Sequence, residues 1–448
     1  MNCRPVAVVV AVVTIVTAVG VGVAGPAVAG PVVDKQVQTI ELVAIDDARF
    51  IFDGRPYTGP IRLTIYDDGI AVTEIVSMTT YLEGIAEMPF SWAGEALKAQ
   101  AVAARTYLAR RLLPGRRGDA ASHEYDICAT NRCQVYRGVQ LIEGSGGDRW
   151  REAIRSTDGE VLLYEGRPIE AVFTSMVGSR SRANQDVWSS DPLPYLQAVD
   201  SPEIGVAPYA QWQVEITTRQ FVEILRADGF DVGGALLSMT VDDPPEGLGR
   251  TNITVETEHG TISILAPALK GVFSRRGDEL YPGALPARLG DGRKLPEPLL
   301  SYTYEITLES QPGSAVDPLL PQSDRSGRDS IVFDGEGWGH GVGMSQWGAR
   351  IMADNGDSYD QILSHYYSGL TPQQAPDVVP DDVVVGLATD LPGVSVEVDG
   401  RAVVLVNGVP AGLVGSGSWI VRDTSGGLDL LPIDGAAPSP ITRRVWPR

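Results

Sequence analysis

The segment Tyr81–Tyr107 constrains the fold more than any other part of the chain, because it predicts a long helix beside a single carboxylate. Pro89 suits a first helical turn, and Ser91 can act as an N-cap. Strong helix formers then continue without a breaker to about Leu113. The pattern therefore predicts a helix that ends near Leu113 and has Glu87 at its mouth.

The apolar residues of this predicted helix are three or four positions apart, which puts them on one face toward a core. They are Leu97, Ala101, Ala104, Leu108 and Leu112. Lys98 and Arg105 share the flank of this stripe. Both are candidates to point toward Glu87, and both are equally typical of plain salt bridges. Glu87 alone is typical of a surface carboxylate, so its role depends on further motifs.

Residues 1–29 have the features of a signal peptide. They contain Arg4, an apolar run from Val6 to Ala24, and the small-x-small ending Ala27-Val28-Ala29. We therefore expect export to the extracellular space or the cell wall, with cleavage after Ala29. An uncleaved membrane anchor is the alternative, because about 20 apolar residues can span a bilayer.

The charge of the chain excludes one class of partner. The net charge is −21, and the longest basic clusters are the pairs Arg110-Arg111 and Arg116-Arg117. Proteins that bind nucleic acids neutralise phosphates with clustered Lys and Arg, so nucleic-acid binding is not expected. The chain that remains after removal of the signal peptide is long enough for two or three domains.

The mature chain keeps only two cysteines, Cys128 and Cys133, because Cys3 leaves with the signal peptide. An isolated pair in an exported protein indicates a disulfide. Closing so short a loop would stabilise the fold by about 2 kcal/mol. A zinc site is the alternative, but zinc needs three or four ligands and the only nearby histidine is His123. We therefore expect no metal and no cofactor.

The pattern of predicted elements indicates an α+β fold. Residues 38–78 alternate apolar and polar side chains between Gly and Asp turns, which predicts a small antiparallel sheet. A second helix is predicted at 147–157, followed by strands at 160–164 and 168–174. Such runs of strands and helices favour mixed antiparallel sheets with helices packed around a cleft over a regular parallel α/β fold.

The second half of the chain divides into an insert, a linker and a tail. From about 203 to 310 the sequence predicts a helix at Thr218–Asp228 but no obvious chemistry. Strands are predicted near 236–242, 251–257 and 261–265. Residues 311–329 are rich in Pro, Ser, Gly and Asp and predict a linker. Strand signals at 381–435 predict a small β-rich module at the C-terminal end.

A glycine-rich segment, Phe333–Gly348, is the second candidate for a site. Glycine at every other position from 335 to 343 lets a ligand or another backbone approach closely. Ser345 can cap the helix that follows, which puts His340, Ser345 and Gln346 at a strand-to-helix corner. Ser345 and His340 also suggest a serine hydrolase, but the G-x-S-x-G motif is absent.

Taken together, these stretches resemble the SpoIID/LytB family of exported bacterial cell-wall proteins. The resemblance runs from about Arg55 to Leu370 and implies one such domain at 38–370, with a less typical insert at about 203–330. The matching stretches are Tyr81–Tyr107, Asp126–Gly138, Asp186–Trp188 with Pro194–Val199, and Gly337–Arg350 with Ile362–Tyr367.

The resemblance implies a lytic transglycosylase that cleaves the MurNAc–GlcNAc bond of peptidoglycan glycan strands. Glu87, in the triplet Glu-Met-Pro, matches the catalytic glutamate of the family. One carboxylate suffices for this reaction because the C6 hydroxyl of the sugar is the nucleophile. We predict that further residues orient the glycan. They are Lys98, Arg105, His340, Ser345 and Gln346.

Three positions depart from the family pattern. Arg132 stands where some members have a zinc-binding histidine, which favours the disulfide over metal. Ser179 follows Gly178 where a double glycine is frequent, and Glu336 stands where a small or basic residue is frequent. The second function to consider is therefore non-catalytic, since the LytB side of the family enhances a separate wall amidase. A purely structural wall protein fits the sequence least well.

Overall fold

The computed structural model describes residues 38–113, 115–188, 190–234, 236–244, 250–289, 292–309, 330–424 and 427–433. The predicted signal peptide and the predicted linker at 311–329 lie outside these residues. Within the described residues, none of the helices combines the length and the apolar character needed to cross a membrane.

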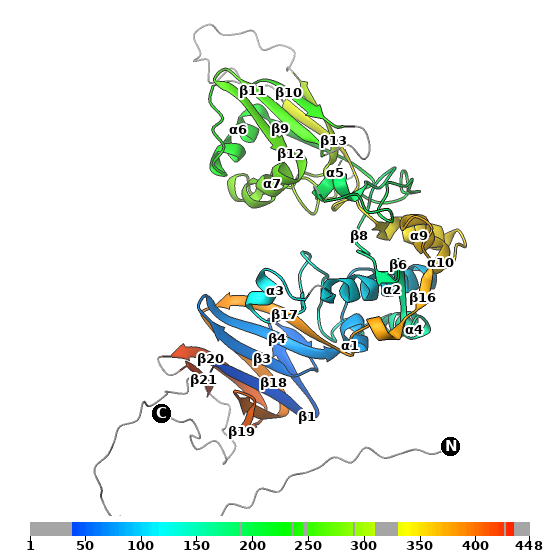
Figure 1. Ribbon diagram of the computed structural model, residues 1–448. Coiled ribbons are helices and arrows are strands. Elements are labelled where there is room, and N and C mark those ends of the chain that lie inside the picture. The colour runs from blue at the N-terminus through cyan, green and yellow to red at the C-terminus, as the bar shows by residue number, and fades with distance from the viewer. Residues whose placement is uncertain are drawn as a thin grey trace, which may run out of the picture. The chain divides into compact units, whose positions relative to one another are not determined.

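The largest sheet is built from strands at both ends of the chain, as the blue and orange arrows of Figure 1 show. Within the described residues, the order along it is β21-β20-β18-β1-β3-β4-β17-β5, with β2 on β1 and β19 on β18. Neighbours are antiparallel, except for the parallel pair β17 and β5. The strands are β1 (Thr39–Phe52), β2 (Arg55–Tyr57), β3 (Ile61–Tyr66), β4 (Gly69–Ser77), β5 (Ile127–Cys128), β17 (Asp382–Leu391), β18 (Gly393–Val406), β19 (Val409–Val414), β20 (Gly417–Thr424) and β21 (Gly427–Pro432).

The predicted β-rich module at 381–435 is not a separate sheet. Strand β17 pairs with β4, and β18 pairs with β1 over most of its length. Alternate residues Val394, Val396 and Val398 of β18 are buried in the same core as the N-terminal strands. Period-two alternation reveals that a strand has one buried face, but it does not reveal the partner strand. The C-terminal strands therefore complete the sheet that begins at Thr39.

The predicted helix is present as α2 (Gly94–Leu112), but it begins later than expected. Its N-cap is Ala93, which makes no side-chain capping bond, so Ser91 does not cap the helix. The N–H of Trp92 donates to the carbonyl of Pro89 at 3.1 Å in a turn that precedes the helix. This turn buries Phe90 against Trp150, with ring centroids 5.5 Å apart. Core packing of Phe90 thus outweighs the helical propensity of Pro89–Trp92, and the helix begins after this segment.

Helix α2 is buried along most of its length rather than on one stripe alone. The predicted stripe residues Leu97, Ala101, Ala104 and Leu108 are fully buried. The helix also contacts other elements on its remaining sides, because its many alanines allow close approach. These elements are α4 (Gly147–Ser156), α9 (Gln346–Asp354), α10 (Tyr359–Tyr366) and β6 (Glu160–Tyr164). The smaller elements nearby are α1 (Met78–Glu83), α3 (Asp119–Ser122), β7 (Arg167–Pro168), β8 (Phe173–Thr174), α5 (Asn184–Trp188), β15 (Met344–Ser345), β16 (Pro372–Gln374) and a 3-10 turn at Pro376–Val378.

The insert has a hydrophobic core of its own. Two three-stranded antiparallel sheets, β13-β14-β9 and β10-β11-β12, accompany helices α6 and α7. Their bounds are β9 (Gln211–Thr217), α6 (Thr218–Ala227), β10 (Leu236–Asp242), β11 (Asn252–Thr257), β12 (Gly260–Leu265), α7 (Ala266–Leu280), β13 (Thr303–Glu309) and β14 (Ser330–Glu336). The helix and the three strands predicted within 203–310 are present as α6, β10, β11 and β12. The α+β prediction is confirmed.

Candidate functional site

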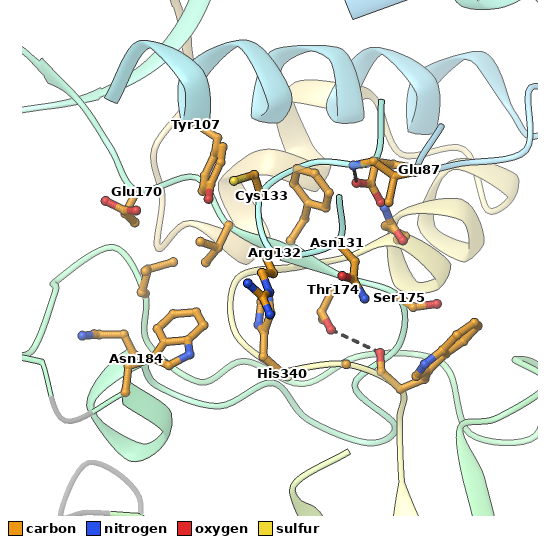
Figure 2. A pocket seen from close by; sticks show the side chains of 18 of the residues that line it. Glu87, Tyr107, Asn131, Arg132, Cys133, Glu170, Thr174, Ser175, Asn184 and His340 are labelled. Atoms are coloured by element: carbon orange, nitrogen blue, oxygen red, sulfur yellow. Dashed lines mark hydrogen bonds between the residues drawn. The ribbon is translucent and has the colours of Figure 1, made fainter. Parts of the chain in front are cut away.

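A cavity of about 1130 Å³ lies where the mouth of α2, the cysteine loop, the glycine-rich segment and the insert meet. Figure 2 shows part of its wall. The charged side chains that line it are Glu87, Arg111, Arg132, Glu170, Lys270 and Glu297. The aromatic side chains that line it are Trp92, Tyr107, Phe173, Trp188, Tyr302, Trp338 and Trp347. A cavity with large aromatic walls and a few charged groups suits an elongated, polar ligand.

Glu87 lies in this cavity, in the connection between α1 and α2. One oxygen, Oε1, accepts a hydrogen bond from the N–H of Val135 at 2.6 Å. Burial raises the pKa of the Glu87 carboxyl, and the hydrogen bonds from Val135 and the side chain of Gln346 partly oppose that rise. Burial therefore outweighs the hydrogen bonds in setting the pKa of Glu87, and Arg105 forms no ion pair with this carboxylate.

The cysteine loop positions the group that holds Glu87. The N–H of Ala86 donates to the carbonyl of Val135 at 2.9 Å, and Ile85 forms a β-bridge with Tyr136. This backbone pairing puts the N–H of Val135 opposite the Glu87 carboxylate. Cys128 and Cys133 close the loop with a disulfide, with Cα atoms 5.6 Å apart.

Removal of this disulfide by Cys128→Ser and Cys133→Ser is expected to lower the free energy of unfolding by about 2 kcal/mol, because the unfolded chain regains loop entropy. The same change frees the loop that carries Arg132 and Val135 to the cavity. Urea unfolding of the double variant and of the native protein measures the effect on stability. Equal unfolding curves for the two proteins would contradict it.

His340 lines the cavity as a neutral ring. Burial lowers its pKa to about 4, so it carries no charge at neutral pH. Its Nδ1 accepts a hydrogen bond from the N–H of Val342 at 3.1 Å. Its ring lies against Trp188, with centroids 5.0 Å apart. His340 therefore forms part of the wall and is a poor candidate for proton transfer.

The alternating glycines allow two backbone segments to approach each other, as the spacing predicts. Gly343 has a φ of 74°, and a Cβ at this position would lie 2.1 Å from the carbonyl oxygen of Val172. Gly337 likewise packs against the backbone of Met176 and Val177. Any side chain at these positions would push apart the two segments that form the floor of the cavity.

Gln346 lies beside Glu87 in the fold. It begins helix α9, its side chain is almost fully buried, and it lines the cavity. Its Nε2 donates to the side chain of Gln100 on α2 at 3.3 Å, and its side chain also hydrogen-bonds Glu87. Gln346 thus connects the glycine-rich segment to the mouth of α2.

Three predicted binding residues lie outside the cavity lining. Lys98 pairs with Glu95 at 2.7 Å. The guanidinium of Arg105 donates to the carbonyls of Glu160 and Ile154, so it holds β6 and the end of α4. Seven-residue spacing fixes the face of α2 that carries Lys98 and Arg105, but other elements cover that face.

The third residue, Ser345, is fully buried. Its Oγ accepts from the N–H of Gly348 and caps α9. Its side chain also hydrogen-bonds the buried Glu203. A serine whose oxygen is used in this way is a structural cap, so the serine hydrolase interpretation has no support in the geometry.

A second group of polar residues lies outside the cavity. Within the described part of the chain, ligand atoms of Asp68, His123 and Asp390 lie within 4.8 Å of one another. His123 already contacts Asp68 at 3.1 Å through Nε2 and Asp119 at 2.8 Å through Nδ1. Burial acts to lower the pKa of His123, but these hydrogen bonds raise it overall. Hydrogen bonds between the imidazole and these carboxylates account for the cluster.

Comparison with known proteins supports the resemblance seen in the motifs. A family model described as SpoIID, stage II sporulation protein, matches residues 66–164. Stage II sporulation protein D of Bacillus subtilis is 26% identical over 69% of this chain and 78% of its own length. The protein of the same name from Bacillus amyloliquefaciens is 26% identical over 70% of this chain and 80% of its own length. These matches support the assignment of the chain to the SpoIID family.

A further relative is named amidase enhancer and also comes from Bacillus subtilis. It is 30% identical over 64% of this chain, but the match spans only 39% of its own length. The family model includes Glu87, the whole of α2 and the cysteine loop. Together these matches support a role related to the cell wall.

Two departures from the family pattern contact each other. The backbone N–H and the hydroxyl of Ser179 both donate to Oε2 of Glu336, at 2.9 and 2.5 Å. The α-carbon of Gly178 lies so close to Glu336 that a Cβ there would approach its side chain to 2.6 Å. Ser179 and Glu336 therefore act as one pair, which joins the two segments that the glycines bring together.

Sequence reasoning missed most of the cavity wall. Among the described residues, neither Arg111 nor Arg132 forms an ion pair, although both line the cavity. The tryptophans were also missed, although all of them lie in stretches that match the family or next to its glycines. They are Trp92, Trp188, Trp338 and Trp347. Tryptophan within a motif was the available signal, since aromatic rings with a polar edge are frequent in binding sites.

Proposed function

We propose that the chain is an exported lytic transglycosylase that cleaves the MurNAc–GlcNAc bond of peptidoglycan glycan strands and leaves 1,6-anhydromuramyl ends. The observation that supports it best is the environment of Glu87. Its carboxyl lies in a large aromatic cavity, and burial raises its pKa, as a general acid near neutral pH requires.

The carboxylates of the cavity favour this reaction over hydrolysis. Glycosidases that use water need two carboxyl groups close to the scissile bond. Glu170 and Glu297 also line the cavity, but Glu170 lies 3.7 Å from Arg110 and Glu297 pairs with Lys270. Figure 2 has Glu170 on the opposite side of the view from Glu87. Among the cavity carboxylates of the described residues, Glu87 alone has no ion pair.

Glu87 performs both proton transfers in the proposed mechanism. The protonated carboxyl donates its proton to the glycosidic oxygen, and the bond between that oxygen and C1 of the muramyl sugar breaks. The resulting carboxylate then takes the proton of the C6 hydroxyl as O6 bonds to C1. Glu87 ends protonated, no water is consumed, and the mechanism calls for no cofactor.

Arg111 and Arg132 supply positive charge for the substrate. Muramyl sugars carry a lactyl ether whose carboxylate is free when the stem peptide has been removed. A guanidinium binds a carboxylate through two parallel hydrogen bonds, and both arginines lack a protein carboxylate among the described residues. We therefore include strands without stem peptides in the proposed substrate.

Product analysis tests the proposal. The mature protein, without residues 1–29, is incubated with intact and with peptide-stripped glycan strands, and the new ends are identified by mass spectrometry. We expect anhydromuramyl ends, with more turnover on the stripped strands. Reducing ends would mean hydrolysis, and the absence of any new ends would contradict the proposed catalytic activity.

Gln346 provides a test of the acid role that does not depend on the product. Its hydrogen bond stabilises the ionised form of Glu87, so Gln346→Ala should raise the pKa of the carboxyl further. Glu87 must be protonated to act, so the fall of kcat/KM at alkaline pH should move to higher pH. The pH profile of both proteins measures this, and a shift in the opposite direction would contradict the acid role.

The amidase enhancer relative favours a second candidate function. In this alternative the chain binds glycan strands and increases the activity of a separate wall amidase without cleaving glycan itself. Assays of such an amidase with and without this protein separate the two functions. Increased amidase activity that persists in Glu87→Gln, without new glycan ends, would support the alternative.

A further inference from the structure

The insert contributes a charged wall to the cavity, separate from the Glu87 side. Lys270 on α7 and Glu297 in the loop before β13 both line the cavity and form an ion pair with each other. The side chain of Lys270 is 12% exposed and that of Glu297 is 34% exposed. Both residues belong to the segment with its own hydrophobic core, which the sequence left without any chemistry.

This ion pair also holds an aromatic ring of the glycine-rich segment. The indole N–H of Trp338 donates to Oε1 of Glu297 at 3.1 Å, while Oε2 faces Lys270. Tyr209 packs edge-to-face on Trp338, with centroids 5.8 Å apart. The N–H of Gly339 donates to the carbonyl of Leu300 at 2.9 Å. The insert thus fixes the position of a ring that also lines the cavity.

The polar groups on this wall have unused hydrogen-bonding capacity. A carboxylate offers about four acceptor sites, and Glu297 uses two of them on Trp338 and Lys270. An ammonium group has three donors, and Lys270 uses one on Glu297. A fixed indole ring beside such groups suits a pyranose, whose C–H face packs on an aromatic ring while its hydroxyls meet donors and acceptors.

We propose that Lys270, Glu297 and Trp338 form an outer subsite for a sugar unit remote from the scissile bond. The ligand class is an N-acetylhexosamine within a β-1,4-linked chain. This inference rests on the proposed function, because it takes the ligand of the cavity to be a glycan. It gives the insert a role in selecting longer strands.

Binding of sugar oligomers tests the subsite without turnover. The probes are the dimer and the hexamer of β-1,4-linked N-acetylglucosamine, and calorimetry measures their affinity for a Glu87→Gln background. Addition of Lys270→Met and Glu297→Leu should weaken hexamer binding by roughly tenfold or more, because hydrogen bonds to charged groups are lost. Dimer binding should change less.

A matched control removes another ion pair of the same helix. Arg276 and Glu279 pair at 2.8 Å on α7 and do not line the cavity, so Arg276→Met with Glu279→Leu should leave both affinities unchanged. Glu297→Gln, which keeps the size of the side chain, replaces the double variant if that protein does not fold. Hexamer binding equal to that of the control, or equal losses for dimer and hexamer, would overturn the outer subsite.

The outcomes also separate this inference from the proposed function. Loss of hexamer affinity in a protein that produces no anhydromuramyl ends would leave the subsite in place and remove the transglycosylase reaction. Production of such ends by the native protein, with unchanged hexamer affinity in the double variant, would support the transglycosylase reaction and contradict the outer subsite.

Discussion

Glu87→Gln is expected to lower the rate of glycan cleavage by roughly 10³-fold, since general acid–base catalysis contributes about that much. Glutamine has nearly the size of glutamate, and its side-chain oxygen can still accept from the N–H of Val135. It cannot give a proton to the glycosidic oxygen. The fold should therefore persist while the chemistry stops. Mass spectrometry of new ends gives the rate, and circular dichroism checks the fold.

Glu170→Gln is the matched control for this prediction. It changes a second carboxylate of the same cavity, which lies 3.7 Å from Arg110. If a single carboxylate acts, turnover in this variant should stay within a few-fold of the native rate. Comparable losses in both variants, together with reducing ends, would instead indicate a hydrolase that uses both carboxyl groups.

The helix at the mouth of the site was predictable because its signals are local. An uninterrupted run of alanine, leucine and long side chains favours helix whatever the surroundings, and α2 ends at Leu112 as expected. Its start was less predictable, because burial of Phe90 against Trp150 depends on a residue far away in the sequence. The same holds for β17 and β18, whose partner strands lie at the other end of the chain.

A site residue was predictable where the motif that contains it also determines its position in the fold. Gln346 follows directly from the strand-to-helix corner. Lys98 and Arg105 lie outside the cavity lining, because helical spacing gives an angular position on the helix but not what covers that position. Arg105 donates hydrogen bonds to the carbonyls of Glu160 and Ile154, which lie far from it in the sequence and near it only in the fold.

Glu74 is a buried carboxyl group, and its burial disfavours ionisation. It is fully buried on β4, and burial raises its pKa from 4.5 to about 7. The N–H of Gly59 donates to its Oε1 at 2.9 Å, and the hydroxyl of Tyr136 donates to its Oε2 at 2.7 Å. These bonds act to lower the pKa, but they do not cancel the cost of a charge out of water.

The free energy of unfolding should therefore fall as pH rises from about 4.5 to above 7. In this window the folded state binds the Glu74 proton more tightly than the unfolded state, so loss of the proton favours unfolding. A shift of this size corresponds to about 3 kcal/mol. Glu74→Gln cannot titrate, and its oxygen can still accept from the backbone N–H of Gly59.

Urea unfolding of the native protein and of Glu74→Gln at pH 5 and at pH 8 measures this term. Glu87 and Glu203, whose pKa values are also raised by burial, titrate in both proteins and cancel in the comparison. The variant should gain about 3 kcal/mol relative to the native protein between the two pH values. Parallel behaviour of the two proteins would mean that Glu74 keeps one protonation state across the window.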